Sequence, residues 1–224
     1  MGGRPDPREL PLYELSEAAR FVGVSPAALA EWMRPVSDGP KSALPLLHLT
    51  APSSGRLSFA NLAEAHILEA TRKHNIEVSE VRAAIETVRQ RGYGTPHPLL
   101  TREFNTWGKC EFVECLVSGI GDSRDVNRRR VRLSSLAADL DRYLDRIERD
   151  TNDDPYQLFP MRRNQNKYVA LNINVAAGEP VIAGTGLRVR HLSNLIRGGE
   201  SIGSVARRYK LSEHALIEAL AFLA

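Results

Sequence analysis

Side chains of the kinds that perform catalysis occur in this chain, but their spacing matches none of the common catalytic motifs. The sequence has no HExxH metalloprotease motif, no GxSxG nucleophile elbow and no phosphate-binding P-loop. Its six histidines are scattered. The glycines between Gly178 and Val189 lack P-loop spacing, and we expect them to form turns around a short strand. We therefore expect no enzyme activity and no catalytic residues.

Two groups of potential metal ligands are also too sparse to form a site. Cys110 and Cys115 have no second Cys/His pair at a spacing that would complete the four ligands of structural zinc. We expect both thiols to be reduced and packed on a strand. Asp150, Asp153 and Asp154 are expected to lie in a polar turn that would bind a cation only weakly. No metal and no cofactor are predicted.

Residues suited to contact nucleic acid occur near the start of the chain. Residues 11–34 are expected to form two short helices joined by a tight turn at Gly23. Ser25 would cap the second helix and Pro26 would occupy its first position, which together predict a helix-turn-helix. Small residues at the exposed start of the second helix could approach base edges, and nearby cations could bind phosphates. The DNA-binding candidates are Arg20, Ser25, Ala27, Arg34, Lys41 and Arg56.

A second helix-turn-helix is predicted near the other end of the chain, with Ser201 capping its first helix and Leu211 and Ser212 in its turn. Its candidate contact residues are Arg207, Arg208, Lys210, Ser212 and His214. Glu213 and Glu218 lie on its second helix and would repel phosphates. Contact with another protein, or with a second copy of the chain, is therefore at least as strongly predicted as contact with DNA.

The elements between the two motifs are predicted from periodicity. Residues 35–58 are expected to contain one or two short strands that form a wing, and amphipathic helices are expected over 58–74 and 79–90. A boundary follows at 92–98. Beyond it, strands are expected in the segments LLTREF (99–104), CEFVECLV (110–117), YQLFPM (156–161) and YVALNI (168–173).

One long helix is predicted over residues 131–149. Its apolar stripe is expected to cover the small sheet, with a second subunit as the alternative. The stripe consists of Leu133, Leu136, Leu140, Leu144 and Ile147. The basic run at 128–132 is interpreted as the solvated start of this helix, although nucleic-acid binding is an alternative.

Composition limits the class of protein. The 224 residues are 42% apolar, with a net charge of +3 and a sequence pI near 9.0, which is compatible with a nucleic-acid partner without requiring one. No apolar stretch would span a membrane, and the N-terminus lacks the apolar core of a signal peptide, so a cytoplasmic protein is expected. The predicted fold class is α+β and mainly helical. Its predicted parts are a disordered leader (1–10), a winged helix-turn-helix domain (11–92), a central α+β domain (93–177) and a C-terminal helix-turn-helix domain (178–224).

The C-terminal segment resembles a small helix-turn-helix family that recurs in antitoxins, often beside a PIN-like ribonuclease toxin. The matching residues are Pro180, Val181, Ile182, Gly184, Thr185, Gly199, Ser201, Tyr209, Leu211, Ser212, Ala219 and Leu220. Gly186 replaces the arginine that is usual in this family. The N-terminal third is similar to the winged domain of MerR-like regulators, with LAEWM where an Arg-Tyr-Tyr run is usual. The middle of the chain is similar to longer VapB-like antitoxins that contain both ends.

The resemblance implies an antitoxin of a type II toxin–antitoxin system. Such a protein would bind double-stranded operator DNA as a homodimeric autorepressor and would neutralise a PIN-like toxin. Arg188, Arg190 and Arg197 are candidates for pairing with the acidic, metal-binding cleft of that toxin. The alternative is an effector-responsive MerR-like regulator whose central sheet holds a small ligand and which has no toxin partner.

Overall fold

The computed structural model describes residues 5–36, 44–90, 95–118, 126–161 and 166–223, without the side chains of 117, 118, 126–130, 132 and 133. Contacts group the chain into two compact units, residues 1–145 and 146–224. The expected three-part division after residues 92 and 177 does not coincide with these units and stays a prediction. The expected α+β, mainly helical class is confirmed.

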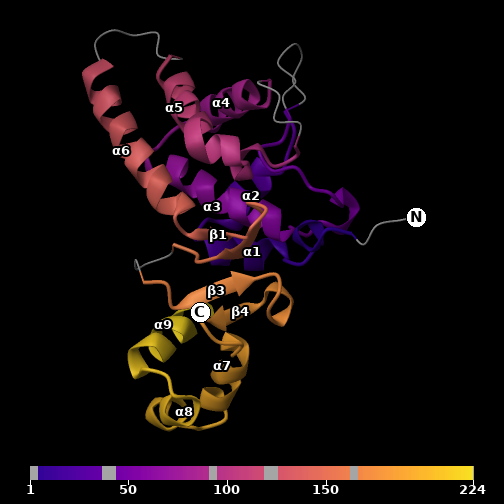
Figure 1. Cartoon of the computed structure of the whole chain (residues 1–224), viewed down its shortest axis with the longest axis vertical. Coiled ribbons are helices and arrows are strands. Elements are labelled where there is room, and N and C mark those ends of the chain that lie inside the picture. The colour runs from indigo at the N-terminus through magenta and orange to yellow at the C-terminus, as the bar shows by residue number, and fades with distance from the viewer. Residues whose placement is uncertain (1–4, 37–43, 91–94, 119–125, 162–165, 224) are drawn as a thin grey trace. The chain divides into compact units, whose positions relative to one another are not determined.

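Unit 1 (1–145) is helical in its described part (Figure 1). Residues 7–9, which were expected to lie in a disordered leader, form the 3-10 helix η1. The α-helices are α1 (Leu15–Val22), α2 (Pro26–Trp32), α3 (Phe59–Lys73), α4 (Val78–Gln90), α5 (Lys109–Ser118) and α6 (Val126–Leu144). The shorter elements are the 3-10 helices η1 (Pro7–Glu9), η3 (Pro52–Ser54) and η4 (Pro98–Leu100) and the π-helix η5 (Phe104–Gly108).

Helix α3 forms the centre of unit 1. Every residue from Phe59 to Thr71 is buried, because α1, α6, η1 and η4 all pack against this helix. A helix that is buried on all sides must satisfy its polar side chains inside the protein. This requirement applies to Asn61, Glu64 and Glu69, which are at most 2% exposed.

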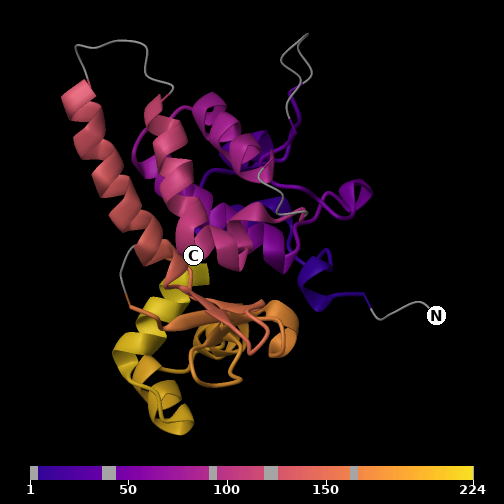
Figure 2. The same ribbon diagram turned by 45° about the horizontal axis from the view of Figure 1, so that its top comes forward.

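Two expected strands are wrong. Residues 99–104 and 110–117 lie in η4, η5 and α5 instead, so Cys110 and Cys115 are on a helix. Aromatic and β-branched residues favoured a strand in this region, but the buried residues follow helical spacing, as Phe112 and Leu116 show. Helix α5 buries that face against α4 and α6 (Figure 2).

The long helix and its apolar stripe also differ from expectation. Helix α6 starts at Val126 and ends at Leu144, so Ile147 belongs to a strand. Leu136 and Leu140 are fully buried, and within unit 1 α6 packs against α3 and α5; the expected cover for the sheet stays a prediction. The side chains of Leu133 and of the basic residues at 128–130 and 132 lie outside the described part.

Unit 2 (146–224) combines a small sheet with three α-helices and one 3-10 helix in its described part. The strands β1 (Ile147–Arg149), β2 (Pro155–Leu158), β3 (Val169–Asn172) and β4 (Pro180–Ile182) form an antiparallel sheet in that order. The strands expected in 156–161 and 168–173 are confirmed as β2 and β3. The 3-10 helix η6 (Ala176–Gly178) joins β3 to β4, and α7 (Val189–Arg197), α8 (Ile202–Tyr209) and α9 (Glu213–Leu223) follow.

Candidate functional site

The first helix-turn-helix has the local geometry that its sequence predicts. Gly23 adopts a left-handed conformation (φ 81°) that ends α1, and its backbone N–H donates to the Ala19 carbonyl. Ser25 caps α2, because its hydroxyl accepts a hydrogen bond from the Ala28 N–H at 3.2 Å, and Pro26 occupies the first turn. Helix α1 itself starts after Glu14, whose side chain makes no cap.

The leading edge of α2 faces solvent. Ser25, Pro26 and Ala27 are all exposed, whereas Leu29 and Trp32 of the same helix are buried. Ser25 uses its hydroxyl as the cap, and neither Pro26 nor Ala27 has a charged or bulky side chain. The edge is therefore small, uncharged and accessible, as approach to the floor of a DNA groove would require.

The cations near this motif differ in their surroundings. Arg34 is exposed, and Arg56 is exposed and forms an ion pair with Glu14. The guanidinium of Arg20 is partly buried, 5.8 Å from the ring centre of Phe21. Lys41 lies outside the described residues. Arg34 and Arg56 are thus the candidates whose accessibility suits a phosphate contact.

The described part of the expected wing contains no pair of strands. Residues 44–58 form bends and η3, with one isolated bridge between Tyr13 and Leu57. Leu46 and Leu47 are buried, and the Leu47 N–H donates to the Trp32 carbonyl at 3.0 Å. This apolar segment therefore packs into the core.

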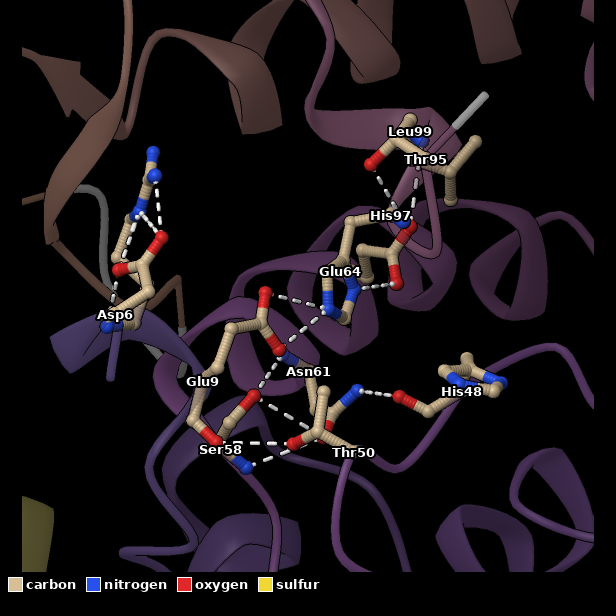
Figure 3. A network of polar contacts seen from close by, with 11 residues as sticks. Asp6, Glu9, His48, Thr50, Ser58, Asn61, Glu64, Thr95, His97 and Leu99 are labelled. Carbon is tan, nitrogen blue, oxygen red and sulfur yellow. Dashed lines mark hydrogen bonds and ion pairs between the residues drawn. The ribbon is translucent and has the colours of Figure 1, made fainter. Parts of the chain in front are cut away.

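A buried polar network lies around α3 in unit 1 (Figure 3). His97, only 5% exposed, lies between two carboxylates: its Nδ1 is 2.8 Å from Glu64 and its Nε2 is 3.1 Å from Glu9. The backbone N–H of Leu99 also donates to Glu64 at 3.3 Å. The network therefore joins η1, α3 and the segment that enters η4.

The carboxylates determine the ionisation of His97. Burial is the largest single influence and disfavours the imidazolium, but the hydrogen bonds and negative charges of Glu64 and Glu9 together outweigh it and raise the pKa of His97 to about 9. At neutral pH His97 is thus a buried cation between two acids. Sequence reasoning missed this group, and the available signal was a glutamate whose neighbours at i−4, i+3 and i+4 on the 58–74 helix are all apolar.

A second part of the network fixes the start of α3. The Ser58 hydroxyl accepts from the Asn61 N–H, while the Asn61 side chain accepts from the Ser58 N–H, which makes a capping box. The Asn61 Nδ2 donates to the His48 carbonyl at 2.7 Å, and the Thr50 hydroxyl donates to the Glu9 carbonyl at 2.9 Å. These contacts hold the 48–50 segment against α3 and η1.

The second helix-turn-helix is formed by α8 and α9. Ser201 caps α8 and Ser212 caps α9, each by accepting from a backbone N–H three residues later. The turn residue Lys210 is left-handed (φ 56°) although it is not glycine. The Glu213 carboxylate lies against Gly203 of α8. A Cβ atom added to this glycine would be 2.9 Å from a carboxylate oxygen of Glu213. This motif packs with α7 and β4 through apolar side chains.

The helices that carry two candidate sets of basic residues, α7 and α8, are in contact through a histidine and a tyrosine. The ring of His191, in the first turn of α7, lies 2.9 Å from the Tyr209 hydroxyl at the end of α8. The exposed Arg188 and Arg190 are close in sequence to His191. The residues close in sequence to Tyr209 are the exposed Arg207, Arg208 and Lys210. Arg197 lies seven residues beyond Arg190, about 10 Å along the helix.

Some of these basic side chains already form ion pairs with acidic residues of the same chain. Arg208 pairs with Glu200 at 2.6 Å, and Arg188 lies 4.0 Å from Glu179. His214, the remaining candidate of the second motif, is exposed and packs edge-on against Tyr168, with ring centres 5.5 Å apart. Surface ion pairs of this kind are weak enough to exchange for a partner's carboxylates.

The acidic turn at 150–154 uses its carboxylates internally. Asp150 accepts hydrogen bonds from the backbone N–H groups of Asn152 and Asp154, and Asp153 lies 3.9 Å from Arg149. Among the described residues, no group of three or more potential ligands is arranged to bind a metal ion. None of the described helices is long and apolar enough to cross a membrane.

Comparisons with known proteins match the C-terminal segment to one family and nearly the whole chain to another protein. Residues 169–223, from β3 to the end of α9, match a family described as "Protein of unknown function (DUF433)". The chain is 27% identical over 228 residues to "Putative antitoxin VapB45" of Mycobacterium tuberculosis strain H37Rv, covering 95% of this chain and 93% of that protein.

A solved structure extends the likeness to the fold. The crystal structure of Rv2018 from Mycobacterium tuberculosis matches with a TM-score of 0.68 and 23% sequence identity, covering 94% of this chain and 97% of that one. At this identity the match shows a common fold. The chain is thus antitoxin-like in sequence over nearly its whole length, with a C-terminal segment that matches the DUF433 model.

Proposed function

We propose that this chain is the antitoxin of a type II toxin–antitoxin pair and acts in the cytoplasm as a homodimeric autorepressor. The observation that carries this proposal is the similarity, over 95% of the chain, to a protein named as an antitoxin. In this proposal the chain has no catalytic role. It has two binding tasks, and each compact unit performs one of them.

Unit 1 binds the operator in this proposal. The exposed, uncharged edge at Ser25–Ala27 enters the major groove, and Arg34 and Arg56 contact phosphates on its flanks. Residues 11–92 act as the MerR-like DNA-binding domain, with the 35–58 segment following the recognition helix. A dimer reads two half-sites, so its operator is a palindrome.

Unit 2 neutralises a PIN-like ribonuclease toxin. Its exposed arginines at the start of α7 and the end of α8 face the acidic, metal-binding cleft of the toxin. A guanidinium suits this task because its fork binds a carboxylate through two parallel hydrogen bonds. The residues expected to be closest to the cleft are Arg188 and Arg190, which lie at the same end as Lys210.

Coexpression with the product of the neighbouring reading frame tests the proposal. A tagged chain is expected to copurify with that product, to suppress its ribonuclease activity and to bind a duplex from upstream of its own gene. Arg190→Glu is expected to weaken the complex about 30-fold or more, because a broken buried charge pair costs roughly 2–5 kcal/mol. Arg102→Glu, the same change at an exposed arginine of unit 1 that belongs to no candidate set, is the matched control.

The alternative function predicts a different outcome. An effector-responsive regulator would purify alone as a monodisperse homodimer, would bind the duplex, and would leave the neighbouring product active. That result would overturn the antitoxin role. Failure to bind the duplex, with toxin inhibition intact, would overturn the operator-binding role alone.

A further inference from the structure

The last turn of α2 ends in carbonyl groups that the helix itself cannot satisfy. Helix α2 has seven residues, and the final four carbonyls of a helix have no partner four residues later in the same helix. The Trp32 carbonyl accepts from the Leu47 N–H at 3.0 Å. The Glu31 carbonyl accepts from the Arg34 N–H at 3.2 Å, just beyond the helix, and also from Nη2 of Arg82, on α4, at 2.9 Å. A residue 51 positions away in sequence therefore holds the end of the proposed recognition helix.

Arg82 binds a second backbone group at the same time. Its Nη1 donates to the Leu44 carbonyl at 2.9 Å. Two turns later on the same face of α4, Nη2 of Arg89 donates to the Pro45 carbonyl at 3.0 Å. We call these two arginines, with the three carbonyls that they bind, the α4 clamp. Its acceptors are backbone atoms, so it depends on the geometry of the arginine fork rather than on a partner's charge.

We infer that Arg82 is a positioning residue for operator binding, and that the α4 clamp sets the direction of α2 relative to the rest of unit 1. This inference rests on the proposed function. A helix of two turns is not stable alone, so contacts with other elements must orient it. Leu29 and Trp32 anchor one face of α2 in the core, and the clamp holds its C-terminal end, which leaves the Ser25–Ala27 edge free to meet DNA.

A direct phosphate contact is the competing role, since Arg82 is only half-buried. The two roles predict different behaviour for Arg82→Lys. Lysine keeps the charge that a phosphate needs, but its compact ammonium cannot bridge the Glu31 and Leu44 carbonyls as the fork does. Arg82→Met removes the charge and the donors while keeping the length of the side chain.

The first test measures the clamp without DNA. In hydrogen exchange of the full chain, R82K and R82M are expected to speed exchange in the peptide that covers α2, while amides of α3 exchange as in the unchanged protein. If R82M fails to fold, R82K still tests the clamp, because lysine keeps the charge and most of the aliphatic part of the side chain. Unaltered exchange in α2 for R82K would overturn the inference.

The second test measures binding to a labelled duplex from upstream of the protein's own gene over a range of salt concentrations. Both Arg82 variants are expected to bind about tenfold more weakly, as for a lost charge-assisted hydrogen bond, with the salt dependence unchanged. The comparison variant is Arg34→Met at a proposed phosphate contact. It should reduce the slope of log K against log salt by about 0.9.

Each alternative outcome has a distinct meaning. If R82K binds like the unchanged protein while R82M lowers the salt slope, Arg82 is a phosphate contact and the inference is wrong. If both variants bind normally, the clamp has no role in recognition. If the unchanged protein does not bind the duplex although its α2 amides are protected, the operator-binding function fails, and the positioning role fails with it.

Discussion

The two helix-turn-helix motifs of this protein have the same backbone design and present different chemistry. In each, the carbonyl of a buried alanine in the first helix, Ala19 or Ala206, accepts hydrogen bonds that close the turn. In each, a serine caps the second helix by accepting from the N–H three residues later, at 3.2 Å for Ser25 and 3.1 Å for Ser212. The two motifs differ in the residue that follows the capping serine.

Pro26 follows the first cap and Glu213 follows the second. Proline presents an uncharged surface, whereas Glu213 brings a carboxylate to the position that would meet phosphates or bases. This carboxylate lies over Gly203 of α8. Under the proposed function, two motifs of the same shape bind different ligands, and the charge on the first turn of the second helix separates DNA binding from protein binding.

The two motifs are also anchored differently. The first packs beside α3, whose Glu64 is held by a buried histidine cation, while the second packs on α7 and β4 through side chains such as Val189, Leu192 and Leu216. The stability of unit 1 should therefore depend on ionisation. Both tryptophans, Trp32 and Trp107, lie in unit 1, so their fluorescence reports on that unit alone.

The largest expected effect distinguishes the buried ion pair of unit 1 from the apolar packing of unit 2. His97→Gln leaves the buried Glu64 without its cation and should lower the free energy of unfolding of unit 1 by about 3–5 kcal/mol, as for other broken buried pairs. Tryptophan-detected denaturation measures this loss, and hydrogen exchange in α9 should not change. His48→Gln is the matched control, because that side chain is exposed. Equal midpoints for the two variants would show that the network contributes nothing to stability.

The same histidine should give unit 1 a pH dependence. The folded pKa of His97, about 9, lies above its ordinary value of 6.5. Its contribution is therefore fully present below pH 6.5 and is lost as the pH rises through 9. The loss should be about 3 kcal/mol in total, since one pKa unit corresponds to 1.36 kcal/mol. Tryptophan-detected unfolding across this range measures the loss, which His97→Gln should abolish; an equally steep slope in that variant would assign the dependence to another group.

Exchanging the residue after the cap should convert the chemistry of one motif toward that of the other. Pro26→Glu gives the first motif the acidic start of the second and should weaken operator binding on the order of tenfold, through repulsion from phosphates. The helix itself should not suffer, because an acidic residue favours the N-terminal turn by about 0.3–1 kcal/mol. Titration of the labelled duplex measures the loss. Unchanged affinity would mean that the α2 edge does not approach DNA.

The smallest expected effect tests the shared backbone design. Ser25→Ala and Ser212→Ala each remove one cap and should each cost about 1 kcal/mol. Tryptophan-detected denaturation measures the first loss, and hydrogen exchange in α9 measures the second. Markedly unequal losses would show that the two motifs, despite their matching hydrogen bonds, are not energetically equivalent.

Much of the local architecture follows from short-range signals. Ser25–Pro26, Ser201 and Ser212 predict helix starts because a cap acts within three residues. The aromatic and β-branched residues of the YVALNI segment (168–173) predict β3, because strand propensity is also a local preference. Such interactions connect neighbours in the chain, so they can be read without knowing the fold.

Other features depend on which segments meet in three dimensions. The CEFVECLV segment is a helix because its buried face lies against α4 and α6, and this contact outweighs its aromatic and β-branched content. His97 meets Glu64 and Glu9 across 33 and 88 positions of sequence, and Arg82 meets Glu31 across 51. The sequence alone thus determined the two motifs and their caps. Tertiary structure decided what anchors them, because burial and long-range charge pairing exist only once distant segments have packed together.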